Sequence, residues 1–214
     1  MSVQALLVDV QRGLESLYAL EPEAPVSDFL LSAQAAREYP GGGSRTLFAQ
    51  DGDGVSVGVV LDPGVGDLLA ELDPRVQLDG RNLDSYCAAI EEVSHFVYLL
   101  FCARTERTVT QLELELQGEV DKYLGAVFLL SLQNEGAVSS RLKELLFHHY
   151  RIADTVSGER AERYRAASHL AYRYCQYLEQ NFLRRSRLAD LARESRRFYR
   201  LGQREKLEKI AELH

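Results

Sequence analysis

One segment of the sequence combines residue types that could bind a metal ion. Residues 90–101, IEEVSHFVYLLF, place two glutamates, a serine and a histidine in an otherwise apolar stretch. Glu92 and His95 are three residues apart, so a helix would carry them on the same face. Carboxylate and imidazole groups are common ligands of zinc, iron and manganese. The segment therefore indicates a candidate metal site.

A second pair of acidic residues lies in the next expected helix. Glu115 and Glu119 are four residues apart and would also share a helix face. If the two helices form an antiparallel hairpin, their polar stripes could meet. The candidate ligands are then Glu92, His95, Glu115 and Glu119, with Glu91 as an additional candidate. The cofactor would be zinc or another divalent metal.

Two known metal-site patterns are only partly present. In the zinc-peptidase pattern HExxH, two histidines bind the metal, whereas here the pattern reads EEVSH with Glu91 at the first position. Di-metal helical bundles need two Glu-x-x-His motifs, and the sequence supplies one at Glu92–His95. A simpler interpretation, which the sequence alone favours, is solvated glutamates, a hydrogen-bonded His95 and ion pairs to Lys122.

The C-terminal region indicates a different kind of site. Its basic residues alternate with Phe198 and Tyr199, an arrangement that could bind an acidic protein, a second copy of the chain, or RNA. A solvated helix face with local Arg–Glu pairs is the competing interpretation. The residues concerned are Arg184, Arg185, Arg187, Arg193, Arg196, Arg197 and Arg200.

Composition limits the function classes. The 214 residues carry a net charge of −7, which disfavours a dedicated nucleic-acid binder. The first 81 residues hold 13 acidic residues against five arginines and no lysine, so acidic and basic regions are segregated. Three cysteines without ligand spacing favour a reducing compartment. The start of the chain has no basic region typical of a signal peptide, and no uninterrupted apolar run spans a bilayer. We expect a cytoplasmic protein of bacterial type.

The apolar pattern indicates the elements that must position these residues. Residues 3–20 read as an amphipathic helix, 27–38 as a short helix or bent strand, and 45–61 as a β-hairpin around an Asp-Gly turn. A helix is expected at 83–104, capped by Asn82, and another at 108–133. Further helices follow to the C-terminus. The fold class is α+β, predominantly helical, with an N-terminal part at 1–81 and a C-terminal helical bundle at 82–214 in one continuous unit.

The segregated charges favour a cytoplasmic interaction protein over an enzyme. The leading hypothesis is a regulatory accessory subunit that binds another protein, or itself, through these charged surfaces. No membrane partner is expected, and a nucleic-acid partner is disfavoured but stays open. It depends partly on the lack of a complete catalytic signature. The first alternative is a metal-dependent hydrolase built on the EExxH segment and a downstream glutamate. The second is RNA binding through the C-terminal arginines.

Overall fold

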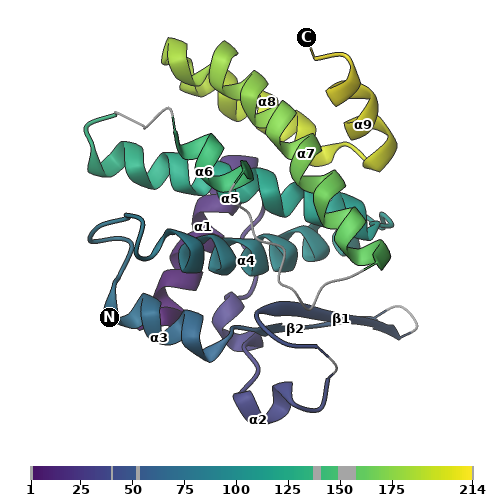
Figure 1. Cartoon of the computed structure of the whole chain (residues 1–214). Helices are drawn as coiled ribbons and strands as arrows, with labels where there is room; N and C mark the ends of the chain where they lie inside the picture. The colour runs from purple at the N-terminus through teal and green to yellow at the C-terminus, as the bar shows by residue number, and fades with distance from the viewer. Residues whose placement is uncertain (1, 40, 52–53, 137–140, 149–157, 214) are drawn as a thin grey trace.

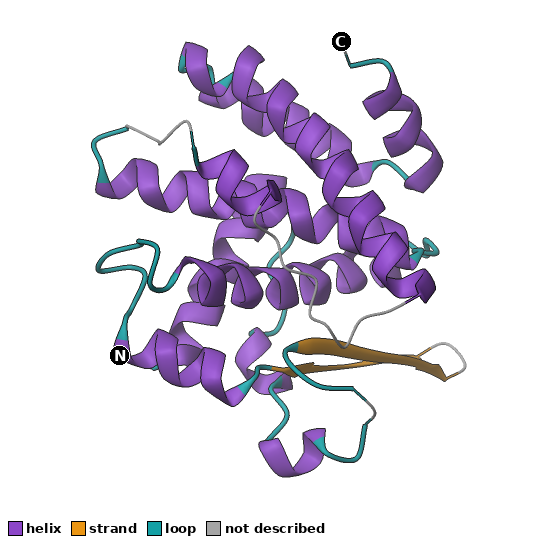
Figure 2. Cartoon of the chain, viewed as in Figure 1, coloured by secondary structure: helices purple, strands orange, loops and turns teal. Residues whose placement is uncertain are grey.

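The structure is a computed structural model that describes residues 2–39, 41–51, 54–136, 141–148 and 158–213. Within these ranges it is predominantly helical with one antiparallel hairpin, so the predicted fold class is confirmed (Figures 1 and 2). The elements are α1 (Val3–Tyr18), η1 (Val26–Phe29), α2 (Ala33–Ala36), β1 (Arg45–Asp51), β2 (Gly54–Val60), α3 (Pro63–Glu71), α4 (Leu83–Arg104), α5 (Gln111–Gln133), α6 (Leu142–His148), α7 (Gly158–Asn181), η2 (Leu183–Arg185), α8 (Leu188–Arg200) and α9 (Gln203–Ala211).

The elements are arranged in layers. The hairpin packs on α4, α4 on α5, and α5 on α7, while α1 crosses behind this stack and contacts α4, α5 and α8 (Figure 1). One hydrophobic core joins residues from α1, β2 and all the longer helices. Within it the ring of Tyr18 stacks on that of Tyr199, with their centroids 3.9 Å apart. The division at residue 81 stays a prediction.

Helices α4 and α5 form the central pair, and it runs antiparallel. Tyr98 near the end of α4 contacts Glu113 near the start of α5, and Ser94 contacts Asp121 further along. The sequence predicts the bounds of α4 correctly, but the Asn82 side chain does not cap it, because its oxygen accepts the Asp79 N–H at 3.0 Å instead of an N–H of the first turn. Helix α5 begins at Gln111, where the Thr110 hydroxyl accepts the Glu113 N–H.

The hairpin pairs β1 with β2 in a continuous register, from Arg45 opposite Val60 to Asp51 opposite Gly54. Gly58 pairs with Leu47 in the regular register and allows close packing on the other side of β2 from its neighbours in sequence. A Cβ atom at Gly58 would lie 3.0 Å from the side chain of Leu31. The turn was predicted within the DGDG segment at 51–54, and its two central residues, 52–53, lie outside the described residues. The segment 27–38, predicted as a short helix or bent strand, forms short helical turns, with a single isolated parallel bridge from Leu30 to Val59 between them.

Helix α4 is more apolar than the uninterrupted apolar runs in its sequence indicate. Three acidic residues interrupt its sequence, yet by length and composition this 22-residue helix is long and apolar enough to cross a membrane. In the structure 72% of its most apolar window is buried inside the protein. A mostly buried helix of this kind is typical of the core of a soluble protein. The apolar residues of α4 therefore serve the core.

Candidate functional site

Three of the predicted polar residues meet between α4 and α5. One ligand atom from each of Glu91, His95 and Glu115 lies within 4.8 Å of the others. Glu91 and His95 are four residues apart on α4, and Glu115 reaches them from α5, with its Oε2 3.7 Å from His95 Nε2. We call these three residues the glutamate–histidine cluster. Its members come from two rigid helices, which fixes their relative positions.

The Nε2 atom of His95 is buried without a hydrogen-bond partner among the described residues. The residue as a whole is 7% exposed. A buried polar atom without a partner costs about 1–3 kcal/mol and is commonly satisfied by an ordered water or a bound ion. Tyr174, Ser195 and Tyr199 carry such atoms as well, but only His95 Nε2 lies beside two carboxylates of the cluster. Burial also lowers the pKa of His95 to about 4, against the opposing effect of Glu91. The imidazole is therefore neutral at pH 7, the form that binds metals.

A glycine makes the close approach of the two helices possible. A Cβ atom at Gly118 on α5 would lie 3.0 Å from His95 Nε2 and 3.6 Å from Glu91 Cγ. A methyl group at this position would require the imidazole to shift by a few tenths of an ångström. The glycine stands one helical turn after Glu115, so the bare backbone forms the floor under the cluster.

Helix α7 supplies a further contact. A hydrogen bond from Tyr164 reaches Glu115. Burial raises the pKa of Glu115 to about 7, and the negative charge of Glu91 acts in the same direction, while the Tyr164 hydrogen bond opposes both. Glu115 thus lies in an environment where an additional positive charge would be favourable.

Lys122 neutralises part of this negative charge. Its Nζ donates to Glu91 Oε2 at 2.9 Å and to Glu119 Oε1 at 2.8 Å. Burial would raise the pKa of Glu91, but the Lys122 ammonium outweighs it and holds that pKa below its ordinary value. Burial raises the pKa of Glu119, with Lys122 acting against it. Glu119 thus lies beside the cluster as a partner of Lys122.

Glu92 lies on the other side of the imidazole. Its Oε2 is 4.0 Å from His95 Nδ1 and accepts a 2.7 Å hydrogen bond from the Thr46 hydroxyl on β1. Burial raises the pKa of Glu92 well above its ordinary value, and nearby Glu91 adds to the effect. The structure therefore brings His95 and Glu115 together with Glu91, the additional candidate, and gives Glu92 and Glu119 other partners.

A second group of buried polar residues was not found from the sequence. It lies on the other polar face of the α4–α5 pair, and we call it the core polar network. Asp121 accepts hydrogen bonds from Tyr18, Ser94 and Gln117, and Lys206 of α9 donates to Tyr98 and Gln117 at 2.8 Å each. The network comprises Tyr18, Ser94, Tyr98, Arg107, Glu113, Gln117, Asp121 and Lys206.

The sequence did contain a signal for this network. Glu113, Gln117 and Asp121 recur every four residues and form a polar stripe on the helix, separate from Glu115 and Glu119. The structure buries all three. Nothing comparable marks Lys206, which sits among charged residues near the C-terminus but is fully buried. Lysines in such positions are almost always exposed, so sequence alone does not identify it.

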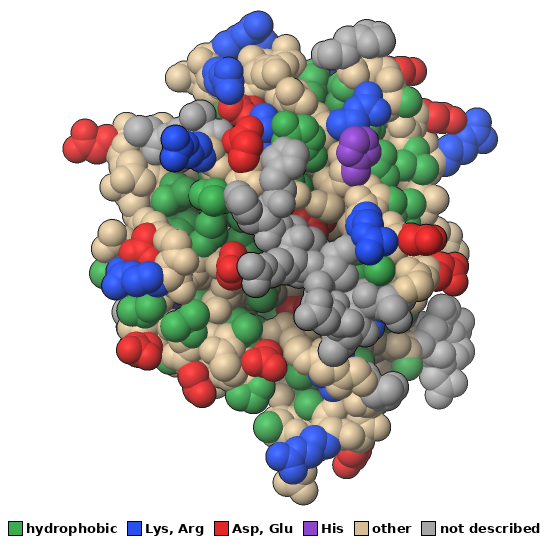
Figure 3. Space-filling model, viewed as in Figure 1, with side chains coloured by type: hydrophobic (Ala, Val, Ile, Leu, Met, Phe, Trp, Pro, Cys, Tyr) green, Lys and Arg blue, Asp and Glu red, His purple; other side chains and the backbone are tan. Residues whose placement is uncertain are grey.

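Most of the C-terminal arginines bind groups within the chain. Arg184 pairs with Glu179, and Arg187 and Arg193 both pair with Asp190. Arg185 and Arg197 are exposed, and their side chains have no hydrogen bond or ion pair to another described residue. On the face shown in Figure 3, basic side chains are separated by acidic and apolar ones and form no continuous patch.

The two remaining arginines join α8 to the end of α1. Arg196 donates to the carbonyls of Ser16 and Leu17, and Arg200 to those of Tyr18 and Ala19. Carbonyls at a helix C-terminus lack partners within the helix and carry partial negative charge, so they bind guanidinium groups well. These two arginines therefore have a structural role.

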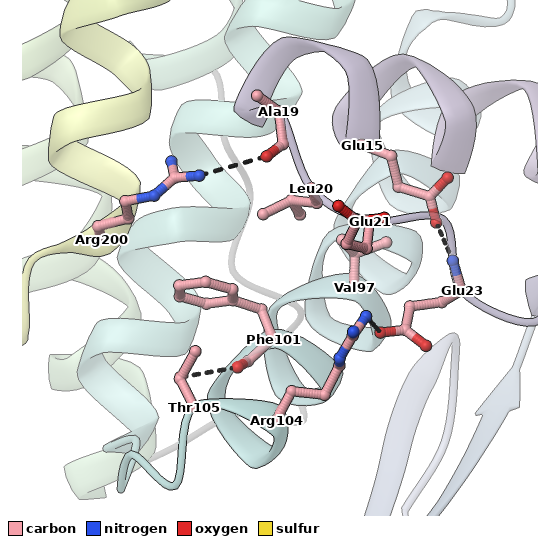
Figure 4. Close-up of a pocket in the computed structure, with 10 residues that line it drawn as sticks. All are labelled: Glu15, Ala19, Leu20, Glu21, Glu23, Val97, Phe101, Arg104, Thr105 and Arg200. Carbon is pink, nitrogen blue, oxygen red and sulfur yellow. Dashed lines mark hydrogen bonds and ion pairs between the residues drawn. The ribbon is translucent and has the colours of Figure 1, made fainter.

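A surface pocket of about 280 Å³ lies beside this contact, between the C-terminal ends of α1 and α4 (Figure 4). Its apolar wall is formed by Leu20, Val97 and Phe101. Arg104 at its rim pairs with Glu23 at 2.6 Å, and the pocket lining includes none of the glutamate–histidine cluster. The pocket and the cluster are therefore separate features.

Comparison of the chain with protein-family models, with curated proteins and with solved structures gives no match.

Proposed function

We propose that this protein binds a divalent transition-metal ion at the glutamate–histidine cluster. The observation that carries the proposal is the buried Nε2 of His95, which faces two carboxylates and has no hydrogen-bond partner among the described residues. A cation coordinated by Glu91, His95 and Glu115 would satisfy this atom and neutralise both carboxylates.

The chemistry of these ligands indicates the class of metal. One imidazole with two carboxylates suits zinc, iron or manganese better than calcium or magnesium, which take oxygen ligands. Three protein ligands also leave a tetrahedral ion one position for water, as in catalytic zinc sites. Metal-assisted hydrolysis is therefore the reaction class that we propose if the protein is an enzyme.

Metal titration of the chelator-treated protein tests the proposal. We expect one Zn²⁺ or Mn²⁺ ion to bind per chain, and binding to be lost in His95→Ala. His169→Ala is the matched control, because His169 is exposed on α7 away from the described cluster. Circular dichroism verifies that both variants fold. Equal binding by wild type and His95→Ala would reject the cluster as the site.

Binding of a partner protein through the basic region has less support. Five of its seven arginines are engaged within the chain, which leaves Arg185 and Arg197 as candidates for such an interface. RNA binding has the same difficulty, because phosphate contacts need several available cations. Both alternatives remain proposals.

A further inference from the structure

We infer that Lys122 is an internal cation that competes with the metal ion for Glu91 and so lowers the metal affinity of the site. This inference rests on the proposed metal-binding function. It assigns a role to a residue that the sequence indicates only as an ion-pair partner.

The geometry of the lysine supports this role. Lys122 Nζ lies 2.9 Å from Glu91 Oε2 across the helix pair and 2.8 Å from Glu119 Oε1 on its own helix. The residue is only 5% exposed, so water screens its charge poorly. Glu91 is thus shared between the ammonium group and the cluster that would hold the metal.

The charges allow an exchange between the two cations. When a divalent ion binds Glu91 and Glu115, the two carboxylates neutralise it, and Lys122 keeps Glu119 as its counter-ion. Without the metal, the same lysine neutralises Glu91. Like charges in a buried site repel strongly, so an ammonium group on a shared carboxylate opposes metal binding. This arrangement indicates an exchangeable metal whose occupancy follows its concentration.

An orienting role for Lys122 makes the opposite prediction. A lysine that holds Glu91 in the correct rotamer for the metal would strengthen binding, as supporting hydrogen bonds do in many metal sites. Removing the lysine would then weaken binding, whereas removing a competitor tightens it. The sign of the change in affinity separates the two roles.

The decisive variant is Lys122→Met, which keeps the length of the side chain and removes the charge. We expect its Zn²⁺ affinity, measured by competition with a chromophoric chelator at constant pH, to be at least tenfold higher than that of wild type. Lys122→Arg keeps the charge, so its Zn²⁺ affinity should remain within about threefold of that of wild type. A tenfold change in affinity corresponds to about 1.4 kcal/mol. Unchanged or weaker binding by Lys122→Met overturns the inference.

A second pair of variants covers the case in which Lys122→Met fails to fold. Glu119→Gln removes the second of the two described counter-ions, which should strengthen the hold of Lys122 on Glu91 and weaken metal binding. The double variant Glu119→Gln, Lys122→Gln should recover at least wild-type affinity. If the double variant binds as weakly as Glu119→Gln, then Glu119 is itself a ligand and Lys122 is no competitor.

The outcomes also separate this inference from the proposed function. If wild type binds metal and Lys122→Met binds no tighter, only the inference fails. If wild type and every lysine variant bind none, both fail. If only Lys122→Met binds, and binding disappears when His95→Ala is added, the lysine is a competitor strong enough to exclude metal from the natural protein. That result supports the inference and rejects the proposed function.

Discussion

Gly118 leaves the space that the imidazole of the glutamate–histidine cluster occupies. Gly118 lies within α5, where glycine normally destabilises a helix by about 0.5–1 kcal/mol relative to alanine. The chain accepts that cost at the one place where a Cβ atom would meet His95 Nε2 at 3.0 Å. Glycine at this position is thus explained by the space that His95 and Glu91 occupy beside it, and not by helix propensity.

We predict that Gly118→Ala weakens metal binding at least tenfold without increasing the free energy of unfolding, because the new methyl group displaces the imidazole. Gly13→Ala is the matched control, since Gly13 is exposed within α1 and a Cβ atom there would meet nothing within 4 Å. The control should gain about 0.5–1 kcal/mol in urea unfolding. An equal gain in Gly118→Ala, with unchanged metal binding, would contradict this explanation.

Only part of the glutamate–histidine cluster could be predicted from the sequence. His95 and Glu115 could be predicted, because their types and positions in two adjacent helices were evident. The choice between Glu91 and Glu92 could not be. It depends on the rotation of α4 against α5, which the packing of the whole core determines, and the sequence carries no local signal for it.

At the scale of elements, α4 and α5 share two different polar faces. On α4, Glu91 and His95 belong to the glutamate–histidine cluster, whereas Ser94 and Tyr98 belong to the core polar network. The bounds of α4 and the hairpin were predictable from periodicity and an Asp-Gly turn. The burial of both polar faces was not, because a polar stripe on a helix normally faces water.

The contact between α8 and α1 gives a prediction at this scale. Replacing both Arg196 and Arg200 by alanine removes four hydrogen bonds to the last carbonyls of α1. Because both side chains are partly solvated, we expect a loss of about 1–3 kcal/mol in the free energy of unfolding. Chemical denaturation measures it. Arg197→Ala on the same helix should change stability by less than about 0.5 kcal/mol. Equal effects of the two changes would show that the capping bonds contribute nothing.

At the scale of the whole molecule, Lys206 links the last helix to the core. It is fully buried, and its Nζ lies 4.5 Å from the centre of the Tyr98 ring and 5.1 Å from that of Phe198. Burial lowers the pKa of Lys206 from 10.5 to about 7, with Glu113 and Asp121 opposing the shift and Arg107 adding to it. The protonation state of one residue is thus coupled to the stability of the entire fold.

The sign of this coupling follows from the lowered pKa. Between pH 7 and pH 10.5 the unfolded chain keeps a proton that the folded protein has lost, so stability rises with pH in that range. The slope is at most about 1.4 kcal/mol per pH unit. We predict that urea unfolding at pH 7, 8 and 9 shows this rise in wild type and a smaller one in Lys206→Met. Lys209→Met, on the same helix but nearer to solvent, should keep the wild-type slope. Identical slopes in all three proteins would mean that Lys206 does not titrate in this range.

The paired contacts between α4 and α5 have a consequence for the history of the sequence. Ser94 with Asp121, and Tyr98 with Glu113, are buried pairs in which losing one member leaves the other unsatisfied. A single change at such a position is costly, and a matching change at its partner that restores the hydrogen bond recovers part of the loss. Homologous chains should therefore vary at these positions in concert. Covariation between residues 94 and 121 would indicate that the homologues keep the same register between α4 and α5.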